Sequence, residues 1–347
     1  MTRARFWAVL AIALSVVVVT GAVLVPIPFV SRSPGPVFDI LGTNENKQVL
    51  VISGTKTHPT TGVLDMTTVA ESGGSSGQIT VGSALVGLFM PDTTVVPDDS
   101  AAEPGDREVQ EAIFRDSTSG ALGAAARYLD RPVRSYATVL QVVAGGASEG
   151  LLQTGDTVVA IDGKKIDTRE DVSAAISGQP AGTTFAITVE RDGKERVVEV
   201  TSRQDPDDPA KAVIGVLLDD QYRSDFKATV NLDNIGGPSA GLMLSIGMVD
   251  RLTPGDLLGG RTVAGTGTID GQGHVGAIGG IDKKMIAAQQ AGAELFLAPA
   301  DNCPDVVGSQ PDGLPVVPVA TLTEAITALE DWRAGRPLPG CPRTGDE

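Results

Sequence analysis

The residues best suited to chemistry lie in two glycine-rich stretches in the second half of the chain. The stretch "NIGGPSAGLML" (234–244) places Ser239 just before an apolar run, and "IGGIDKK" (278–284) places two lysines after a glycine pair. The surroundings of Ser239 allow three interpretations. The serine caps a helix, it belongs to a glycine loop that binds phosphate at a helix N-terminus, or it is a nucleophile.

A nucleophilic serine needs a base, because its hydroxyl reacts weakly at its usual pKa. The two histidines of the chain, His58 in "THPTTG" and His274 in "GQGHVG", lie in turns typical of a surface, although neither is excluded. Lys283 and Lys284 open a predicted helix, where the helix dipole and burial would both disfavour the ammonium form. A lysine kept neutral there suits a general base, and a solvated lysine pair is the alternative. The phosphate interpretation is weaker, because the chain has no GxxxxGK[ST] motif.

Regular elements are expected on both sides of these stretches. The apolar periodicity and the turn residues predict which segments are strands and which are helices. Residues 78–90 fit either a strand or a helix, and 98–129 is polar and partly helical with a break at Pro104-Gly105. The remaining expected strands are 47–53, 62–72, 226–232 and 294–299, and the expected helices are 239–252, 281–292 and 321–335.

The segment from Tyr136 to Ser202 has the pattern of a small domain. It contains a short strand over 157–161, a helix with Thr168 as its cap, and a hairpin that turns at Asp192-Gly193. It resembles a bacterial PDZ domain through Ala147, Gly150, Leu151, Gly155, Asp156, Ile161, Gly163 and Ile166. The resemblance implies binding of an extended peptide, often a C-terminus, at a sheet edge. No carboxylate-binding loop stands out, and a spacer that binds nothing is the alternative.

The serine and lysine stretches together resemble the proteolytic domain of Lon-type proteases. "GPSAG" (237–241), "GTGTI" (265–269) and "IGGIDKK" carry the similarity, and "GVLDMTTV" (62–69) resembles an early strand of that family. The resemblance assigns Ser239 and Lys284 as a catalytic dyad and Thr266 as the residue that helps to hold the lysine. Gly237 and Pro238 complete the serine motif as supporting residues.

Some positions depart from the pattern of the Lon-type family, and the glycine spacing shows which of the two lysines fits that pattern. Gly279-Gly280 has the family's spacing to Lys284, whereas Lys283 is one residue too early. Gly236 stands where many Lon proteins have an acidic residue, and Asp233 is out of register. The sequence also contains no AAA+ ATPase segment. The arrangement resembles the membrane-anchored, PDZ-containing Lon-like proteases of bacteria.

The N-terminal segment predicts one membrane crossing. Phe6 to Val25 is a run of twenty residues without a charge, preceded by Arg3 and Arg5. Such a run spans a hydrocarbon core of about 30 Å, and the basic flank favours a cytoplasmic N-terminus with the rest outside the cell. A cleaved signal peptide is the alternative. Outside the cytoplasm a disulfide between Cys303 and Cys341 is permitted, and two free thiols are the alternative.

The expected architecture is α+β, a Lon-type α/β peptidase domain with an inserted PDZ half-open β-barrel. Its expected parts are the cytoplasmic tip and transmembrane anchor (1–30), the N-terminal part of the Lon-like domain (31–125), the PDZ domain (126–205) and the serine peptidase domain (206–347). The resemblance implies an ATP-independent endopeptidase that cleaves extracytoplasmic or membrane-associated proteins, with the PDZ domain selecting substrates or gating access. It implies no nucleotide, cofactor or metal.

The expected partners are protein or peptide substrates, including C-terminal tails, and the membrane through residues 6–25. The net charge of −16 argues against nucleic acid, which needs a basic surface. A homo-oligomer is left open. The alternative function is a non-catalytic extracytoplasmic PDZ scaffold that binds peptide tails.

Overall fold

The computed structural model describes residues 7, 15–16, 19–21, 23–73, 78–90, 92–98, 106–206, 208–233 and 235–342. Most of the predicted membrane anchor therefore lies outside the described residues. Among the residues that are described, no helix combines the length and the apolar character needed to cross a bilayer. The anchor consequently stays a prediction.

The larger part of the molecule is built on a six-stranded mixed sheet with the order β22-β21-β18-β6-β2-β8. The four strands from β22 to β6 are parallel, and β2 and β8 complete the sheet in antiparallel fashion. The mixed α/β character expected from the sequence is confirmed. The strands are β2 (Phe29–Asp39), β6 (Val63–Ser72), β8 (Thr94–Pro97), β18 (Thr262–Gly265), β21 (Leu295–Pro299) and β22 (Val316–Val319).

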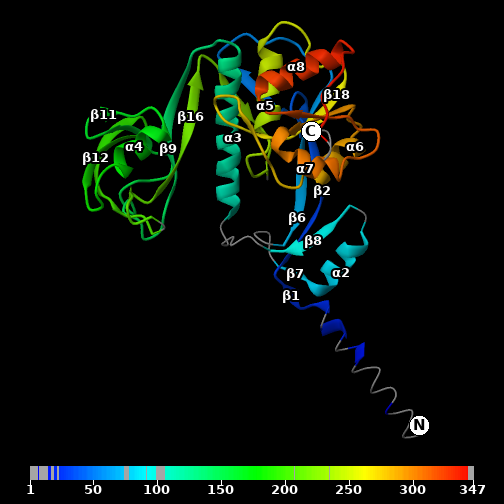
Figure 1. Cartoon of the computed structure of the whole chain (residues 1–347), viewed down its shortest axis with the longest axis horizontal. Helices are drawn as coiled ribbons and strands as arrows, with labels where there is room; N and C mark the ends of the chain where they lie inside the picture. Colours follow the sequence, from blue (N-terminus) through cyan, green and yellow to red (C-terminus); the bar gives the residue numbers. More distant parts are fainter. Residues whose placement is uncertain are drawn as a thin grey trace.

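Helices pack around a core centred on α5 (Gly241–Leu252), which is buried from Gly241 to Asp250. This burial explains why the run after Ser239 is almost wholly apolar. Helix α3 (Asp106–Tyr128) runs beside α5, and Figure 1 shows it standing between the two lobes of the molecule. The other helices of this part are α6 (Ile281–Gln290), α7 (Cys303–Val307), α8 (Leu322–Arg333) and the 3-10 turn η2 (Ala300–Asn302).

A second lobe, green in Figure 1, has its own sheet with the order β13-β12-β10-β9-β16 and its own apolar core. Phe185, Ile187 and Val189 of β12 point into that core, as their alternation predicts. Thr168 and Asp171 form a capping box at the start of α4 (Arg169–Ser177). The strands are β9 (Val133–Val142), β10 (Thr157–Ile161), β11 (Lys164–Lys165), β12 (Thr184–Arg191), β13 (Lys194–Thr201) and β16 (Val216–Ser224).

The second lobe continues beyond residue 205, where the sequence places the end of the PDZ domain. Strand β16 pairs with β9 over its whole length, and Ile214 belongs to the core of this lobe. The pairing joins residues about 80 positions apart, and no local pattern marks it.

The segment 78–90, left open between strand and helix, forms β7 (Ile79–Thr80) and then α2 (Val81–Phe89). Thr80 starts the helix through a capping box with Ser83. The remaining short strands are β1 (Pro26–Ile27), β3 (Thr43–Asn44), β4 (Lys47–Gln48), β5 (Leu50–Ser53), β14 (Arg203–Gln204), β15 (Ala212–Val213), β17 (Lys227–Val230), β19 (Thr268–Ile269) and β20 (Val275–Gly276).

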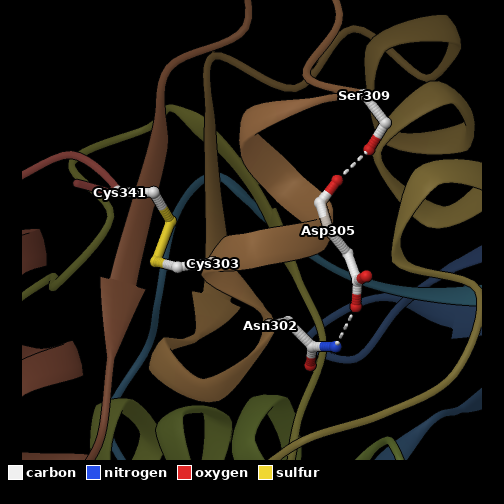
Figure 2. Close-up of a disulfide and its surroundings, with 5 residues drawn as sticks. All are labelled: Asn302, Cys303, Asp305, Ser309 and Cys341. Carbon is white, nitrogen blue, oxygen red and sulfur yellow. Dashed lines mark hydrogen bonds between the residues drawn. A yellow bond between two sulfur atoms is a disulfide. The ribbon is translucent and has the colours of Figure 1, made fainter. Parts of the chain in front are cut away.

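Cys303 and Cys341 form a disulfide, which Figure 2 shows between the start of α7 and the C-terminal segment. The described residues contain no free cysteine, so the alternative of two thiols is wrong for this structure. The bond closes a loop with a sequence separation of 38 residues. It therefore holds the C-terminal segment against the parallel edge of the large sheet.

Candidate active site

Ser239 lies in the turn before α5 and does not cap that helix. The N-cap position is occupied by Ala240, and no side chain makes a capping hydrogen bond there. The capping interpretation is therefore wrong. The half-buried Ser239 side chain instead faces a cavity and lies beside the amine of Lys284.

Lys284 is the fourth residue of α6, and its side chain is directed at Ser239. Its Nζ is 2.7 Å from Ser239 Oγ and 3.0 Å from Thr266 Oγ1. The residue is only 4% exposed, and burial lowers the pKa of its amine to about 8. Burial has this effect because the ammonium form loses its hydration. In the described part of the chain Lys284 makes no ion pair, whereas the neighbouring Lys283 pairs with Asp282 at 3.1 Å.

Thr266 connects the lysine to the backbone of the serine. Its Oγ1 accepts a hydrogen bond from Lys284 Nζ and donates one to the carbonyl oxygen of Ser239 at 3.1 Å. The Gly267 amide donates to the same carbonyl at 2.9 Å. The loop after β18 thus fixes both the main chain of Ser239 and the amine of Lys284.

Helix α3 contacts the turn that carries Ser239 on the side opposite the loop after β18. The sequence analysis did not predict this contact. Ser117 Oγ donates to the carbonyl of Pro238 at 2.9 Å, and the Gly237 amide donates to the carbonyl of Gln110 at 3.2 Å. A Cβ at Gly241 would lie 3.0 Å from Ser117 Oγ, so the second glycine of "GPSAG" permits this close approach. The small residues of "STSGALGAAA" (117–126) were the available signal, because they allow two helices to pack closely.

The departure at Gly236 has a steric explanation. A Cβ at this position would lie 2.7 Å from Cβ of Gln110, which is too close for a side chain without movement of α3. Asp233, the other residue considered for a carboxylate role, is exposed and does not line the cavity. The acidic position of many Lon proteins therefore has no counterpart in this turn.

The cavity in front of Ser239 and Lys284 has a volume of about 750 Å³. Gly237 and Pro238 line it, as do Gly279 and Gly280 before α6. Strands β2 and β6 form one wall of the cavity, with the side chains of Arg32, Met66, Thr67, Thr68 and Glu71. The lining also includes the side chains of Gln110, Phe114, Ile235 and Ile278. The cavity thus lies directly beside the side chains of Ser239 and Lys284.

Neither histidine is part of this site. His274 Nδ1 lies 2.8 Å from Asp270 Oδ2, and its side chain is 70% exposed. His58 lies in the turn before β6, where its amide donates to the carbonyl of Arg251. Both residues are outside the cavity lining. Of the three candidate bases, the structure therefore places only Lys284 beside Ser239.

A second cavity, of about 790 Å³, lies in the smaller lobe between α4 and the segment 212–218. Val172, Ser173 and Ile176 of α4 form one side of this groove, and Ile214 to Leu218 form the other. The sequence analysis did not point to this groove, because "AVIGVLL" (212–218) lies beyond the predicted end of the domain. β16 is the last strand of its sheet, and Val216 to Leu218 at its start line the groove.

Comparisons with known proteins agree with both parts of the molecule. Residues 120–201 match the PDZ domain family, and residues 234–329 match the Lon protease (S16) C-terminal proteolytic domain. The PDZ domain of the SdrC-like protein from Listeria innocua is 23% identical, covers 24% of this chain and 92% of its own, and has a TM-score of 0.23.

Curated Lon proteases match parts of the chain. Lon protease from Roseiflexus castenholzii is 41% identical over 70 residues, which are 20% of this chain and 8% of that protein. Lon protease 2 from Bacillus subtilis is 34% identical over 111 residues, which are 30% of this chain and 19% of that protein. The aligned segments thus span less than a fifth of these relatives. Together the matches show a PDZ domain and a Lon-type C-terminal proteolytic domain in one chain.

Proposed function

We propose that this protein is an ATP-independent serine endopeptidase in which Ser239 and Lys284 form the catalytic dyad. The observation that carries the proposal is the buried amine of Lys284, 2.7 Å from Ser239 Oγ and without an ion pair in the described part of the chain. Its pKa of about 8 leaves a useful fraction of the amine neutral near physiological pH. A neutral amine next to a serine hydroxyl is what an activated nucleophile requires.

In the proposed reaction, Lys284 Nζ takes the proton from Ser239 Oγ as that oxygen attacks a peptide carbonyl carbon. The lysine then gives the proton to the leaving nitrogen, and the same amine activates the water that releases the acyl group. The amides of Ser239 and Ala240 make no hydrogen bond within the described residues. They are the proposed donors to the oxyanion, at the positive end of α5.

The substrate is proposed to lie as an extended strand along β6. β18 pairs with β6 only as far as Met66, and Thr67 to Glu71 continue along the cavity wall. In the described part of the chain no strand pairs with that edge beyond Met66, and the peptide is proposed to add there. Added strands are a common mode of peptide recognition. A segment bound in this way must be unfolded or locally exposed.

The PDZ groove is proposed to capture substrate tails and to raise their concentration at the protease. The groove between α4 and the outer edge of β16 suits a chain end added beside that strand. Residues 6–25 are proposed to cross the cell membrane once, with the N-terminus in the cytoplasm and both domains outside. The uncharged run and its basic flank support this topology.

The decisive experiment follows cleavage of an unfolded protein by the full chain and by three variants. Ser239→Ala and Lys284→Met are each expected to lower kcat by at least ~1,000-fold, because each removes one half of the dyad. Lys283→Met is the matched control, since Lys283 is adjacent in sequence and nearly as buried, at 6% exposed. The kcat of Lys283→Met is expected to stay within a few-fold of the kcat of the parent protein. Full activity in Ser239→Ala would refute the mechanism, and equal loss in the two lysine variants would refute the assignment of the base.

The role of the groove is tested separately with a short unstructured peptide and a protein substrate. Ser173→Trp is expected to fill the groove and to slow cleavage of the protein while leaving cleavage of the peptide unchanged. Ala174→Trp is the control, because Ala174 is exposed on the same helix but outside the groove lining. A recognition role of the groove would be contradicted if the two tryptophan variants slowed protein cleavage equally. It would also be contradicted if Ser173→Trp slowed cleavage of the peptide and of the protein equally.

A further inference from the structure

Helix α2 carries an apolar surface that is turned away from the protein. Its buried residues are Ala84 and Gly87, which face the sheet. At Gly87 a Cβ would lie 3.0 Å from Cγ2 of Val95 on β8, so this side of the helix is packed closely. The opposite side exposes about half or more of each large side chain, and Phe89 is 87% exposed. The α2 apolar surface consists of Leu85, Val86, Leu88, Phe89 and Met90.

The α2 apolar surface is tethered to the end of the uncharged N-terminal run. β1 follows Val25 directly and pairs with β7, which leads into α2. The amide of Val81, the first residue of α2, donates to the carbonyl of Val25 at 2.9 Å. A Cβ at Gly82 would lie 2.3 Å from Cγ1 of Val23, which shows how closely the two segments meet. Figure 1 shows α2 next to the point where the N-terminal segment enters the structure.

The chemistry of this region suits lipid chains. From Ser72 to Pro91 the sequence contains no charged residue, although the chain as a whole carries a net charge of −16. Val23, Leu24 and Val25 are also exposed, so the apolar character continues from the N-terminal run to α2. An exposed apolar patch of this kind marks an interaction site. Amphipathic helices that lie in the membrane interface bury Leu and Phe side chains at the boundary between lipid headgroups and acyl chains.

We propose that the α2 apolar surface inserts into the outer leaflet of the same bilayer that residues 6–25 cross. The inference rests on the anchor proposed above, because the anchor brings α2 to the lipid. Two contacts, at Val25 and at α2, restrict rotation of the protein about its anchor. β2 runs from this region to the candidate active site, where Arg32 lines the cavity. Arg32 follows Val25 by seven positions, so the cavity stays within about 25 Å of the leaflet surface.

The test places one fluorescent probe on the full chain. Phe89→Cys is labelled with an NBD group, and the native cysteines do not react because they are bonded to each other. Val197→Cys is the matched control, because Val197 is an exposed apolar residue of β13 in the other lobe, 67% exposed. Both proteins are reconstituted into phosphatidylcholine vesicles with and without nitroxide-labelled acyl chains. Flotation and cleavage of a short peptide show that each protein is inserted and folded.

If α2 inserts into the bilayer, we expect lipid nitroxides to lower the fluorescence of the probe at 89 by ~3-fold or more. The fluorescence of the probe at 197 should change very little. A chain that floats with vesicles but shows no quenching at 89 would overturn the docking surface and leave the anchor intact. The probe at 89 could instead show blue-shifted emission that the nitroxides do not quench and that changes when the protein is diluted. That result would assign the α2 apolar surface to contact with a second copy of the chain. A chain that does not float would overturn both the anchor and the docking surface.

Discussion

Thr266 Oγ1 lies 3.0 Å from Lys284 Nζ, and the same hydroxyl donates its proton to the carbonyl of Ser239. Because its own hydrogen is used, Thr266 can only accept from the amine. A neutral amine that donates to Thr266 presents its lone pair to Ser239 Oγ, which lies 2.7 Å away. In the proposed mechanism the threonine is therefore a positioning residue that orients Lys284 as the base.

The first prediction concerns this orientation. Thr266→Val keeps the shape of the side chain but removes the acceptor, and we expect kcat to fall by about 10-fold. The pH at which activity reaches half its maximum should move down, because the ammonium form of Lys284 loses one of its hydrogen-bond acceptors. Thr266→Ser should restore both properties. A lower kcat with an unchanged pH profile would indicate a structural role only.

The second prediction follows from the pKa of Lys284, which burial lowers to about 8. The reactive form of the base is the neutral amine, so kcat should rise with pH and level off above about 9. The profile is measured with a short peptide, in order to separate chemistry from substrate capture. His274→Ala should leave it unchanged, because that side chain lies outside the site. A midpoint near the usual histidine pKa, about 6.5, that disappears in His274→Ala would contradict a lysine base.

The third prediction concerns the junction between α3 and β16. Burial is the main cause that raises the pKa of Asp116 to about 9, and its hydrogen bond and repulsion with Asp219 raise it further. Gln221 of β16 donates to Asp116 and so ties the PDZ lobe to α3, whereas Arg169 donates to Asp219 within that lobe. With a raised pKa the folded state holds a proton that the unfolded state releases above about pH 4. This residue therefore makes the protein less stable as pH rises from about 4 to 9.

Asp116→Asn removes this titration while it keeps a side chain that can form hydrogen bonds. We expect the free energy of unfolding at pH 8 to increase by about 1 kcal/mol, with a smaller change at pH 5. Urea unfolding at the two pH values provides the measurement. Asp225→Asn is the control, because Asp225 is exposed and pairs with Arg131 at 2.8 Å. A gain at pH 5 equal to the gain at pH 8 would contradict a protonated Asp116.

The fourth prediction concerns the disulfide. Asn302 precedes Cys303, and its side chain bonds both the amide and the carbonyl of Ile278 at 2.9 Å. Figure 2 shows Asn302 and the Cys303–Cys341 bond on the same short segment. Reduction should lower the free energy of unfolding by about 3 to 4 kcal/mol, because a loop of this length no longer restricts the unfolded chain.

Urea unfolding with and without dithiothreitol measures this loss. Cys341→Ala should be as unstable as the reduced parent and insensitive to the reductant. Because Ile278 lines the cavity, peptidase activity should also be lost at a lower temperature in the reduced protein. Unchanged unfolding midpoints would show that the bond does not constrain the fold.

The sequence by itself selected the main residues of the candidate site. Ser239, Thr266 and Lys284 could be selected because each lies in a short glycine-rich motif whose spacing follows from local turns. The helices 241–252 and 281–290 were also predicted, since apolar periodicity and glycine stops are local signals. The sequence attributed the low pKa of Lys284 to the helix dipole and to burial, and the structure identifies burial as the cause.

Only the tertiary structure decided how distant segments complete these motifs. Ser117 of α3 contacts the serine turn across 121 residues of sequence, and β16 joins the PDZ sheet through pairing with β9. The same holds for α2, whose periodicity did not separate a strand from a helix and did not show which side would be left uncovered. These features depend on which surfaces meet after folding. Contacts between distant residues are set by the packing of whole elements. A local pattern of residue types therefore does not predict them.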